Sequence, residues 1–163
     1  QTISGWASRY IPELKTETPT LEKGHVLVSE VDHKFQQDVF SDNHHWYADE
    51  PVEMGGQNTG PDPYEHLLAA LGACTAMTIR MYANHKKLPL EHVEVSLSHE
   101  RNYLNDAETS EDEHSKIEAL IRKVQLVGPL TDADKERLMQ IADRCPVHKT
   151  LHNNPHVITT IVE

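Results

Sequence analysis

The sequence predicts one mixed domain of helices and strands, preceded by a short appendage. Residues 24–50 alternate in polarity as strands do, residues 63–86 form one long apolar helix, and both patterns recur after residue 90. A chain of 163 residues and 18.5 kDa buries roughly 70% of its unfolded surface, so it can build a core without disulfides or a metal. Hydrophobic residues make up only 37% of it, below the roughly 45–50% (glycine included) that is typical. We therefore expect long polar loops or a core completed by another subunit.

The appendage is expected to span residues 1–22 and the main domain residues 23–163. The stretch Pro12–Lys23 is polar, contains two prolines and shows no helix or strand period, which is typical of a linker. Because the chain starts at Gln1 rather than Met, residues 1–22 could be the tail of a missing upstream domain. A trimmed terminus is the alternative.

Three short strands are expected between residues 24 and 50. Val26 and Val28 alternate with polar residues, Phe35 and Val39 mark a second strand, and a third follows the turn residues 41–43. The next stretch, residues 53–63, holds three glycines and two prolines and is expected to be a loop.

A long helix is expected over residues 63–86. Asp62 suits the N-cap with Glu65 as its capping-box partner, and Pro63 suits the first turn. Basic residues close the helix, in keeping with its dipole, and a proline follows them. Residues 67–81 are apolar nearly all round, so we expect this helix to be central and covered on all sides.

After this helix the pattern returns to strands. Residues 93–97 alternate clearly and predict a strand, and residues 105–115 form an acidic loop. Residues 116–130 look helical at first but end in an alternation that favours a strand.

A second helix and a last strand complete the predicted domain. Thr131 is a good N-cap with Asp134 as its capping-box partner, and Leu138 and Ile141 lie on one helical face. Residues 157–162 are expected to close the domain as a strand.

Charge and composition exclude several functions. The 15 Lys and Arg against 26 Asp and Glu give a net charge of -11, the wrong sign for binding nucleic acid or an anionic membrane. There is no run of about 18 apolar residues, and the first residues lack the regions of a signal peptide. We therefore expect a cytoplasmic protein.

The two cysteines lie far apart in the sequence. Cys74 sits in the middle of the apolar helix, where its small neighbours Gly72 and Ala73 let another backbone approach closely. Cys145 follows the second predicted helix. Taken alone, Cys74 is most simply a buried core thiol. Reactivity would need a charged group from elsewhere, because Cys74 lies about three turns from the start of its helix.

Two motifs around these cysteines resemble a known family. GPDPYEHLLAALGACTAMTIRMYA (residues 60–83) and IADRCPVHKTL (residues 141–151) are similar to the OsmC/Ohr family of thiol-dependent hydroperoxide reductases, in its OsmC-like branch. The resemblance covers about residues 24–162. It implies an α+β fold with antiparallel sheets and central Cys-bearing helices, in an intertwined homodimer with active sites at the subunit interface.

The resemblance also implies roles for the cysteines. Cys74 would be the peroxidatic thiol, oxidised by the hydroperoxide to a sulfenic acid, and Cys145 the resolving thiol that forms a disulfide with it. An external dithiol would reopen the disulfide, and no bound cofactor or metal is expected. The negative charge favours neutral organic hydroperoxides or H₂O₂ as substrates, in a role in oxidative or osmotic stress defence.

The chain departs from the family pattern at the groups that activate the thiol. In better-known branches an Arg and a Glu form a charged pair beside it. The Glu position falls here on Tyr64 and a carboxylate follows at Glu65, which makes Glu65 the third candidate catalytic residue. Residues 35–63 contain no Arg or Lys. The nearest candidates for the positive charge are Lys34, His44 and His45.

Related chains of this branch also occur fused behind an α/β-hydrolase domain. The residues WASRY (6–10) resemble the tail of such a domain. No G-x-S-x-G motif is present, so a hydrolase activity is not expected in these residues.

Two other functions stay open at this stage. The first is a zinc site, since Cys, His, His and His follow one another at spacings of 3, 4 and 4, although prolines and an Asn pair interrupt any helix that would align them. The second is a dimeric module that binds an apolar ligand without turnover. The zinc ligands would be Cys145, His148, His152 and His156, and the apolar pocket would be lined by Leu67, Leu71, Met77, Met81 and Tyr82.

Overall fold

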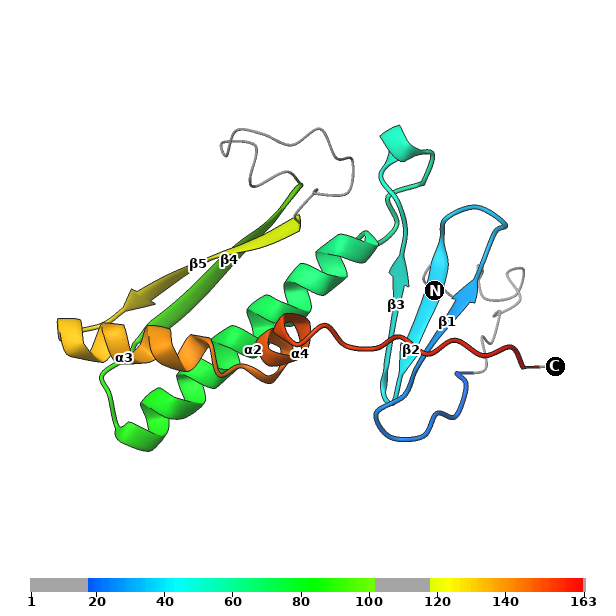
Figure 1. Ribbon diagram of the computed structural model, residues 1–163. Coiled ribbons are helices and arrows are strands. Elements are labelled where there is room, and N and C mark those ends of the chain that lie inside the picture. The colour runs from blue at the N-terminus through cyan, green and yellow to red at the C-terminus, as the bar shows by residue number, and fades with distance from the viewer. Residues whose placement is uncertain (1–17, 102–117, 163) are drawn as a thin grey trace, which may run out of the picture. The chain divides into compact units, whose positions relative to one another are not determined.

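The structure, a computed structural model, describes residues 18–101 and 118–162 (Figure 1). The expected acidic loop at 105–115 and most of the expected appendage lie outside the described residues. The chain divides after residue 62 into two compact units.

The first unit contains a three-stranded antiparallel sheet. Its strands β1 (Val26–Glu30), β2 (Gln37–Ser41) and β3 (His44–Ala48) pair in chain order. Asp42 and Asn43 form the two-residue turn between β2 and β3, which suits the turn preference of these residues. The three strands expected from the sequence are confirmed.

One strand of this sheet is uncovered on both faces. All five residues of β1 are exposed, with Val26 at 59% and Val28 at 56% of their full accessible surface. In contrast, Val39 and Phe40 of β2 are buried. The alternation of apolar and polar residues in β1 therefore gives the strand an apolar face that is exposed to solvent in the single chain.

The loop after β3 is held by one buried carboxylate. Asp49 accepts hydrogen bonds from the backbone N–H groups of Glu50 (2.8 Å), Gln57 (3.1 Å) and Thr59 (3.1 Å), and from the Thr59 hydroxyl (2.9 Å). Burial opposes ionisation of Asp49, but these hydrogen bonds outweigh it and lower the pKa of the carboxyl from its ordinary 3.8. The loop also contains a short 3₁₀ helix, η1 (Val52–Met54).

Two glycines of this loop lie where the backbone passes close to itself. A Cβ built on Gly56 would overlap the carbonyl group of Glu50, and one built on Gly60 would overlap the carbonyl group of Tyr47. The glycine-rich composition of this stretch therefore has a steric reason.

We expect Asp49→Asn to destabilise the chain at neutral pH and to weaken its acid sensitivity. The folded-state pKa of Asp49 is depressed, so its contribution is fully present above the unfolded pKa and is lost as pH falls through the folded pKa. Urea unfolding at neutral pH and at a pH below 3.8 tests this. The variant should lose less stability between the two conditions than the wild type, and an equal loss would contradict the assignment.

The second unit is built around α2 (Pro63–Lys86), which packs against β4 (His92–Arg101). β4 pairs antiparallel with β5 (Glu118–Val127) along its whole length, from His92 opposite Val127 to Arg101 opposite Glu118. Figure 1 shows α2 running beside this two-stranded ribbon. The helix expected over residues 63–86 is confirmed. Across the described ranges, no helix combines the length and apolar character that a membrane span requires.

Residues 118–127 form the strand β5 throughout, although the first of them were expected to look helical. Pairing with β4 holds them extended, so the strand starts at Glu118 rather than partway along the stretch. Val124 and Leu126 pack against the core of the unit, and Leu120 and Arg122 occupy the same face of the strand.

Two more helices complete the second unit: α3 (Asp132–Ala142) and α4 (Pro146–His152). Thr131 and Asp134 form the expected capping box at the start of α3. α4 was not expected, since Pro146 was read only as a helix breaker. Proline is tolerated in the first turn of a helix, and here it begins one.

Replacing the N-cap Thr131 by Ala is expected to cost about 1 kcal/mol in the free energy of unfolding. The change leaves the N–H of Asp134 without its side-chain acceptor at the start of α3. Urea denaturation measures the effect, and Thr131→Ser, which keeps the hydroxyl, is the matched control. Equal destabilisation by Ala and Ser would argue against a capping role.

The core of this unit lies between α2, α3 and the β4–β5 ribbon. Its buried residues are Ile79, Ala83, Leu90, Leu138 and Ala142.

Two apolar segments of the second unit stay uncovered. The expected strand at 157–162 is wrong for the single chain: the segment forms no strand, and its four aliphatic residues are between 87% and 93% exposed. A strand needs a neighbour to pair with, and within the described residues this segment has none. The expected cover around α2 is also incomplete, because Met77 and Met81 are 65% and 72% exposed.

Candidate active site

The structure brings Cys74 and Cys145 together. Cys74 lies on α2, and Cys145 lies at the N-cap of α4, which packs against α2. The two thiols lie close enough for each to shift the pKa of the other, and both are free. Cys74 is half-buried, whereas Cys145 is fully buried. The pair therefore has one member that a small oxidant can reach.

The surroundings of Cys74 favour its neutral form. Burial raises the pKa of the Cys74 thiol, and the adjacent Cys145 raises it further by hydrogen bonding and charge repulsion. The backbone N–H of Val147 and the hydroxyl of Thr78 act in the opposite direction without overcoming this.

The surroundings of Cys145 favour its thiolate. Burial opposes the charge, but hydrogen bonding from the Cys74 thiol and from the backbone N–H groups of His148 and Val147 outweighs it and lowers the pKa. The sulfur faces these N–H groups at the first turn of α4 without forming a full capping hydrogen bond. Of the two thiols, Cys145 therefore loses its proton more readily than Cys74.

Thr75 contributes a further polar group beside Cys145. It is fully buried on α2, and its hydroxyl also lowers the pKa of the Cys145 thiol. The same hydroxyl donates to the carbonyl oxygen of Leu71 (2.7 Å) and accepts a hydrogen bond from Nη1 of Arg122 (2.9 Å).

Arg122 lies next to the cysteine pair and is not among the residues expected there. Its Nη1 also donates to the carbonyl oxygen of Ala142 (3.2 Å), which accepts the backbone N–H of Cys145 (3.3 Å). Its Nη2 forms an ion pair with Asp143 (2.7 Å), and only 13% of the side chain is exposed. A signal was present: Arg122 occupies an inward-facing position of β5 between apolar residues, where a charge needs partners.

Glu65 is not brought to Cys74 within one chain. It lies exposed in the first turn of α2, nine residues before Cys74, which corresponds to about 13 Å along the axis and roughly half a turn around it. Tyr64 stacks on the ring of His99 with centroids 4.2 Å apart. A catalytic role for Glu65 stays a prediction.

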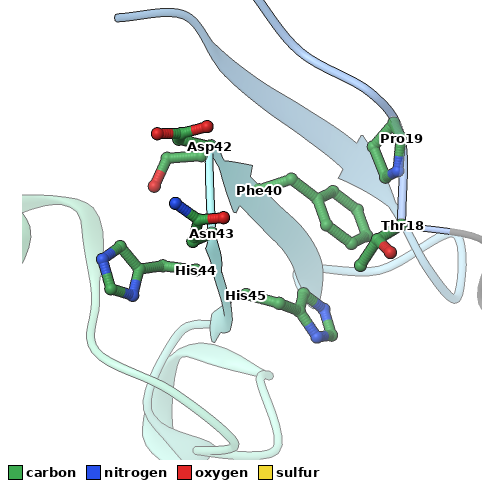
Figure 2. A pocket seen from close by; sticks show the side chains of 8 residues that line it. Thr18, Pro19, Phe40, Asp42, Asn43, His44 and His45 are labelled. Atoms are coloured by element: carbon green, nitrogen blue, oxygen red, sulfur yellow. The ribbon is translucent and has the colours of Figure 1, made fainter. Parts of the chain in front are cut away.

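The other candidates for a positive charge belong to the first unit. Lys34 is exposed, and its backbone N–H donates to Asp32. His45 contacts Asp38 at 2.7 Å and stacks on Phe40. Figure 2 shows a pocket of about 270 Å³ in this unit, lined by Thr18, Pro19, Phe40, Ser41, Asp42, Asn43, His44 and His45. His45 therefore already has a carboxylate partner within the first unit.

An open pocket of about 360 Å³ lies one helical turn from each cysteine. Its apolar residues come from three elements, and its polar groups are a carboxylate and two imidazoles. The lining residues are Leu71, Glu118, Leu120, His148, Leu151 and His152. Such a lining suits a small, largely apolar substrate with a polar end.

The described residues form neither the expected zinc site nor the full expected lining of an apolar-ligand pocket. The rings of His148 and His152 stack at 5.9 Å, but among residues 18–101 and 118–162 no three His, Cys, Asp or Glu side chains converge as metal ligands do. Of the expected apolar lining, Leu71 borders the pocket beside the cysteines, whereas Tyr82 packs against the core and its hydroxyl accepts a hydrogen bond from Arg137.

Two free thiols on packed helices, in a unit that also contains antiparallel strands, are the arrangement expected of a protein that works through its cysteines. The chain belongs to the family of OsmC-like proteins, whose model matches residues 56–160. Both cysteine motifs lie within the match, so the resemblance noted from the sequence is confirmed. No curated protein matches the chain.

Solved structures of this family share the fold. An OsmC-like protein from Mycoplasma pneumoniae is 19% identical with a TM-score of 0.64, over 82% of this chain and 89% of that one. An organic hydroperoxide resistance protein OsmC from Legionella pneumophila is 19% identical with a TM-score of 0.59, over 83% and 93%. One from Elizabethkingia anophelis is 17% identical with a TM-score of 0.59, over 83% and 91%. The OsmC/Ohr-like α+β fold is thereby established.

Proposed function

We propose that this chain reduces organic hydroperoxides, or H₂O₂, by cycling Cys74 and Cys145 between free thiols and a disulfide, as part of oxidative or osmotic stress defence. The observation that carries the proposal is the proximity of two free thiols 71 residues apart, one half-buried and one fully buried, each of which shifts the pKa of the other. Family membership and the hydroperoxide resistance proteins among the structural neighbours support it.

The proposed reaction starts with Cys145 as the thiolate and Cys74 as the neutral thiol. The Cys74 proton passes to the Cys145 thiolate along their hydrogen bond, and the Cys74 thiolate attacks the terminal oxygen of the hydroperoxide. The O–O bond breaks, Cys74 becomes a sulfenic acid, and the departing alkoxide takes the proton from Cys145 to become an alcohol. The Cys145 thiolate then attacks the sulfur of the sulfenic acid, which forms the disulfide and releases hydroxide. The hydroxide takes a proton from solvent and becomes water. An external dithiol reduces the disulfide.

We further propose that the working form is a homodimer. The exposed apolar residues of β1, the stripe on α2 that includes Met77 and Met81, and the tail at 157–162 together leave more apolar surface open than a soluble monomer usually shows. A second copy of the chain covering these segments would also explain the low hydrophobic fraction. The two free cysteines suit a reducing compartment such as the cytoplasm.

A stoichiometric oxidation tests the function. The reduced chain, freed of excess reductant, is mixed with cumene hydroperoxide, and both the cumyl alcohol formed and the remaining free thiols are counted. We expect one alcohol per chain and the loss of both thiols, then continued turnover once dithiothreitol is added. Unchanged thiols with no alcohol formed would overturn the proposal, and binding of the peroxide without turnover would favour the apolar-ligand module.

A further inference from the structure

The cysteine pair lies beside one largely buried cation. The guanidinium of Arg122 reaches it from β5 by two routes that the hydrogen bonds define. One runs through the hydroxyl of Thr75, and the other through the carbonyl oxygen of Ala142, which also accepts the N–H of Cys145. The first route leads to the Cys145 thiol, whose pKa the Thr75 hydroxyl lowers, and the second ends at the backbone N–H of Cys145. This cysteine is fully buried and therefore strongly affected by nearby charge.

The Thr75 hydroxyl can pass the effect of this cation to the sulfur. A hydroxyl has one proton to donate and two lone pairs to accept with. Here it accepts from Arg122 and donates its proton to the Leu71 carbonyl oxygen. When Cys145 is ionised, rotation of the O–H would direct that proton to the sulfur. The hydrogen bond from Arg122 polarises the hydroxyl and makes it a stronger donor.

We propose that Arg122 is the positioning residue of this site and that, acting through Thr75, it holds the negative charge of the cysteine pair on Cys145. Cys145 is then the base that receives the Cys74 proton before the attack on peroxide. This inference rests on the proposed function for its role in turnover. The charge effect on Cys145 is a property of the resting protein and is measured without peroxide.

Other charged or titratable groups lie near Cys145 on each neighbouring element. Cys74 interacts with it from α2, Asp143 lies two residues before it at the end of α3, and His148 turns its backbone N–H toward it in the first turn of α4. Asp143 is the ion-pair partner of Arg122 and is 64% exposed, so it partly offsets the guanidinium from the solvent side. Removing Arg122 and removing Asp143 should therefore have opposite effects on the Cys145 thiol.

The experiment titrates a single thiol in the full chain. In a Cys74→Ser background, the ultraviolet absorbance of the thiolate follows Cys145 as pH rises. Arg122→Gln and Thr75→Val should shift the midpoint to higher pH, Thr75→Ser should keep it, and Asp143→Asn should shift it to lower pH. A parallel series in a His148→Gln background removes any contribution from that imidazole.

Turnover gives a second readout in the chain that keeps both cysteines. The rate with cumene hydroperoxide at neutral pH should fall about tenfold for each unit by which the midpoint rises, and should recover at alkaline pH. A purely structural role for Arg122 would lower the rate at every pH and would leave the direction of the Asp143→Asn shift unexplained.

The outcomes separate the inference from the proposed function. Unchanged midpoints in folded Arg122→Gln and Thr75→Val overturn the inference, whatever the chain does with peroxide. Shifted midpoints in a chain that never consumes peroxide support the charge effect and overturn the function. If Arg122→Gln does not fold, the comparison of Thr75→Val with Thr75→Ser decides, because Val keeps the shape of Thr without its hydroxyl, whereas Ser keeps the hydroxyl without the methyl group.

Discussion

Replacing Cys74 by Ser is expected to abolish reduction of organic hydroperoxides, with a loss of at least about a hundredfold, because the O–O bond then has no sulfur nucleophile within reach. The remaining thiol, Cys145, is fully buried. The measurement is alcohol formed per chain in a single oxidation, with a dimedone probe added to capture any sulfenic acid. No dimedone adduct is expected in this variant.

The matched variant is Cys145→Ser, which keeps Cys74 and removes its partner. We expect it to form one alcohol per chain and then stop, more slowly than the wild type because the base that accepts the Cys74 proton is also removed, with a sulfenic acid on Cys74 that dimedone captures and no intramolecular disulfide. The reverse pattern, an adduct on Cys145 in Cys74→Ser and none in Cys145→Ser, would exchange the two roles. That exchange is a real alternative, since Cys145 carries the lower thiol pKa in the resting pair.

Leu138→Ala is expected to cost about 2–5 kcal/mol in the free energy of unfolding. Leu138 has no exposed surface and lies in the core that joins α2 to α3, so its truncation leaves a cavity that these helices cannot readily fill. Urea or thermal denaturation measures the loss. Met139→Ala is the control on the next residue, which is 42% exposed, and should stay within about 0.5 kcal/mol of the wild type. Equal losses would show that α3 is not packed as described.

Elements whose signals are local were predictable from the sequence. The helix at Pro63–Lys86 has a proline in its first turn and basic residues in its last, and α3 has a complete capping box. The hairpin between β2 and β3 has turn residues that fit only a short connection. In each case the residues that decide the structure lie within a few positions of one another.

Elements that depend on distant partners were harder to predict. The first half of β5 has helix-forming residues, and only its pairing with β4 holds it extended. The tail at 157–162 has the composition of a strand but no neighbour within the described residues.

The site was predictable in part for the same reason. Cys74 and Cys145 could be named from their motifs, whereas Arg122 belongs to no motif. Its signal, a charge at an inward-facing position, shows only once residues 118–127 are taken as a strand. Its position became meaningful only when β5 placed it beside Thr75 and Ala142.

The uncovered tail has a consequence for solubility. The six residues VITTIV (157–162) combine β-branched side chains with no charge, no proline and no glycine, which is the composition of segments that stack into amyloid-like fibrils. Copies of the tail left open would therefore compete to pair with each other, whereas a tail paired in the correct place is removed from that competition. We therefore expect the solubility of the chain to depend on how quickly residues 157–162 find their correct pairing partner.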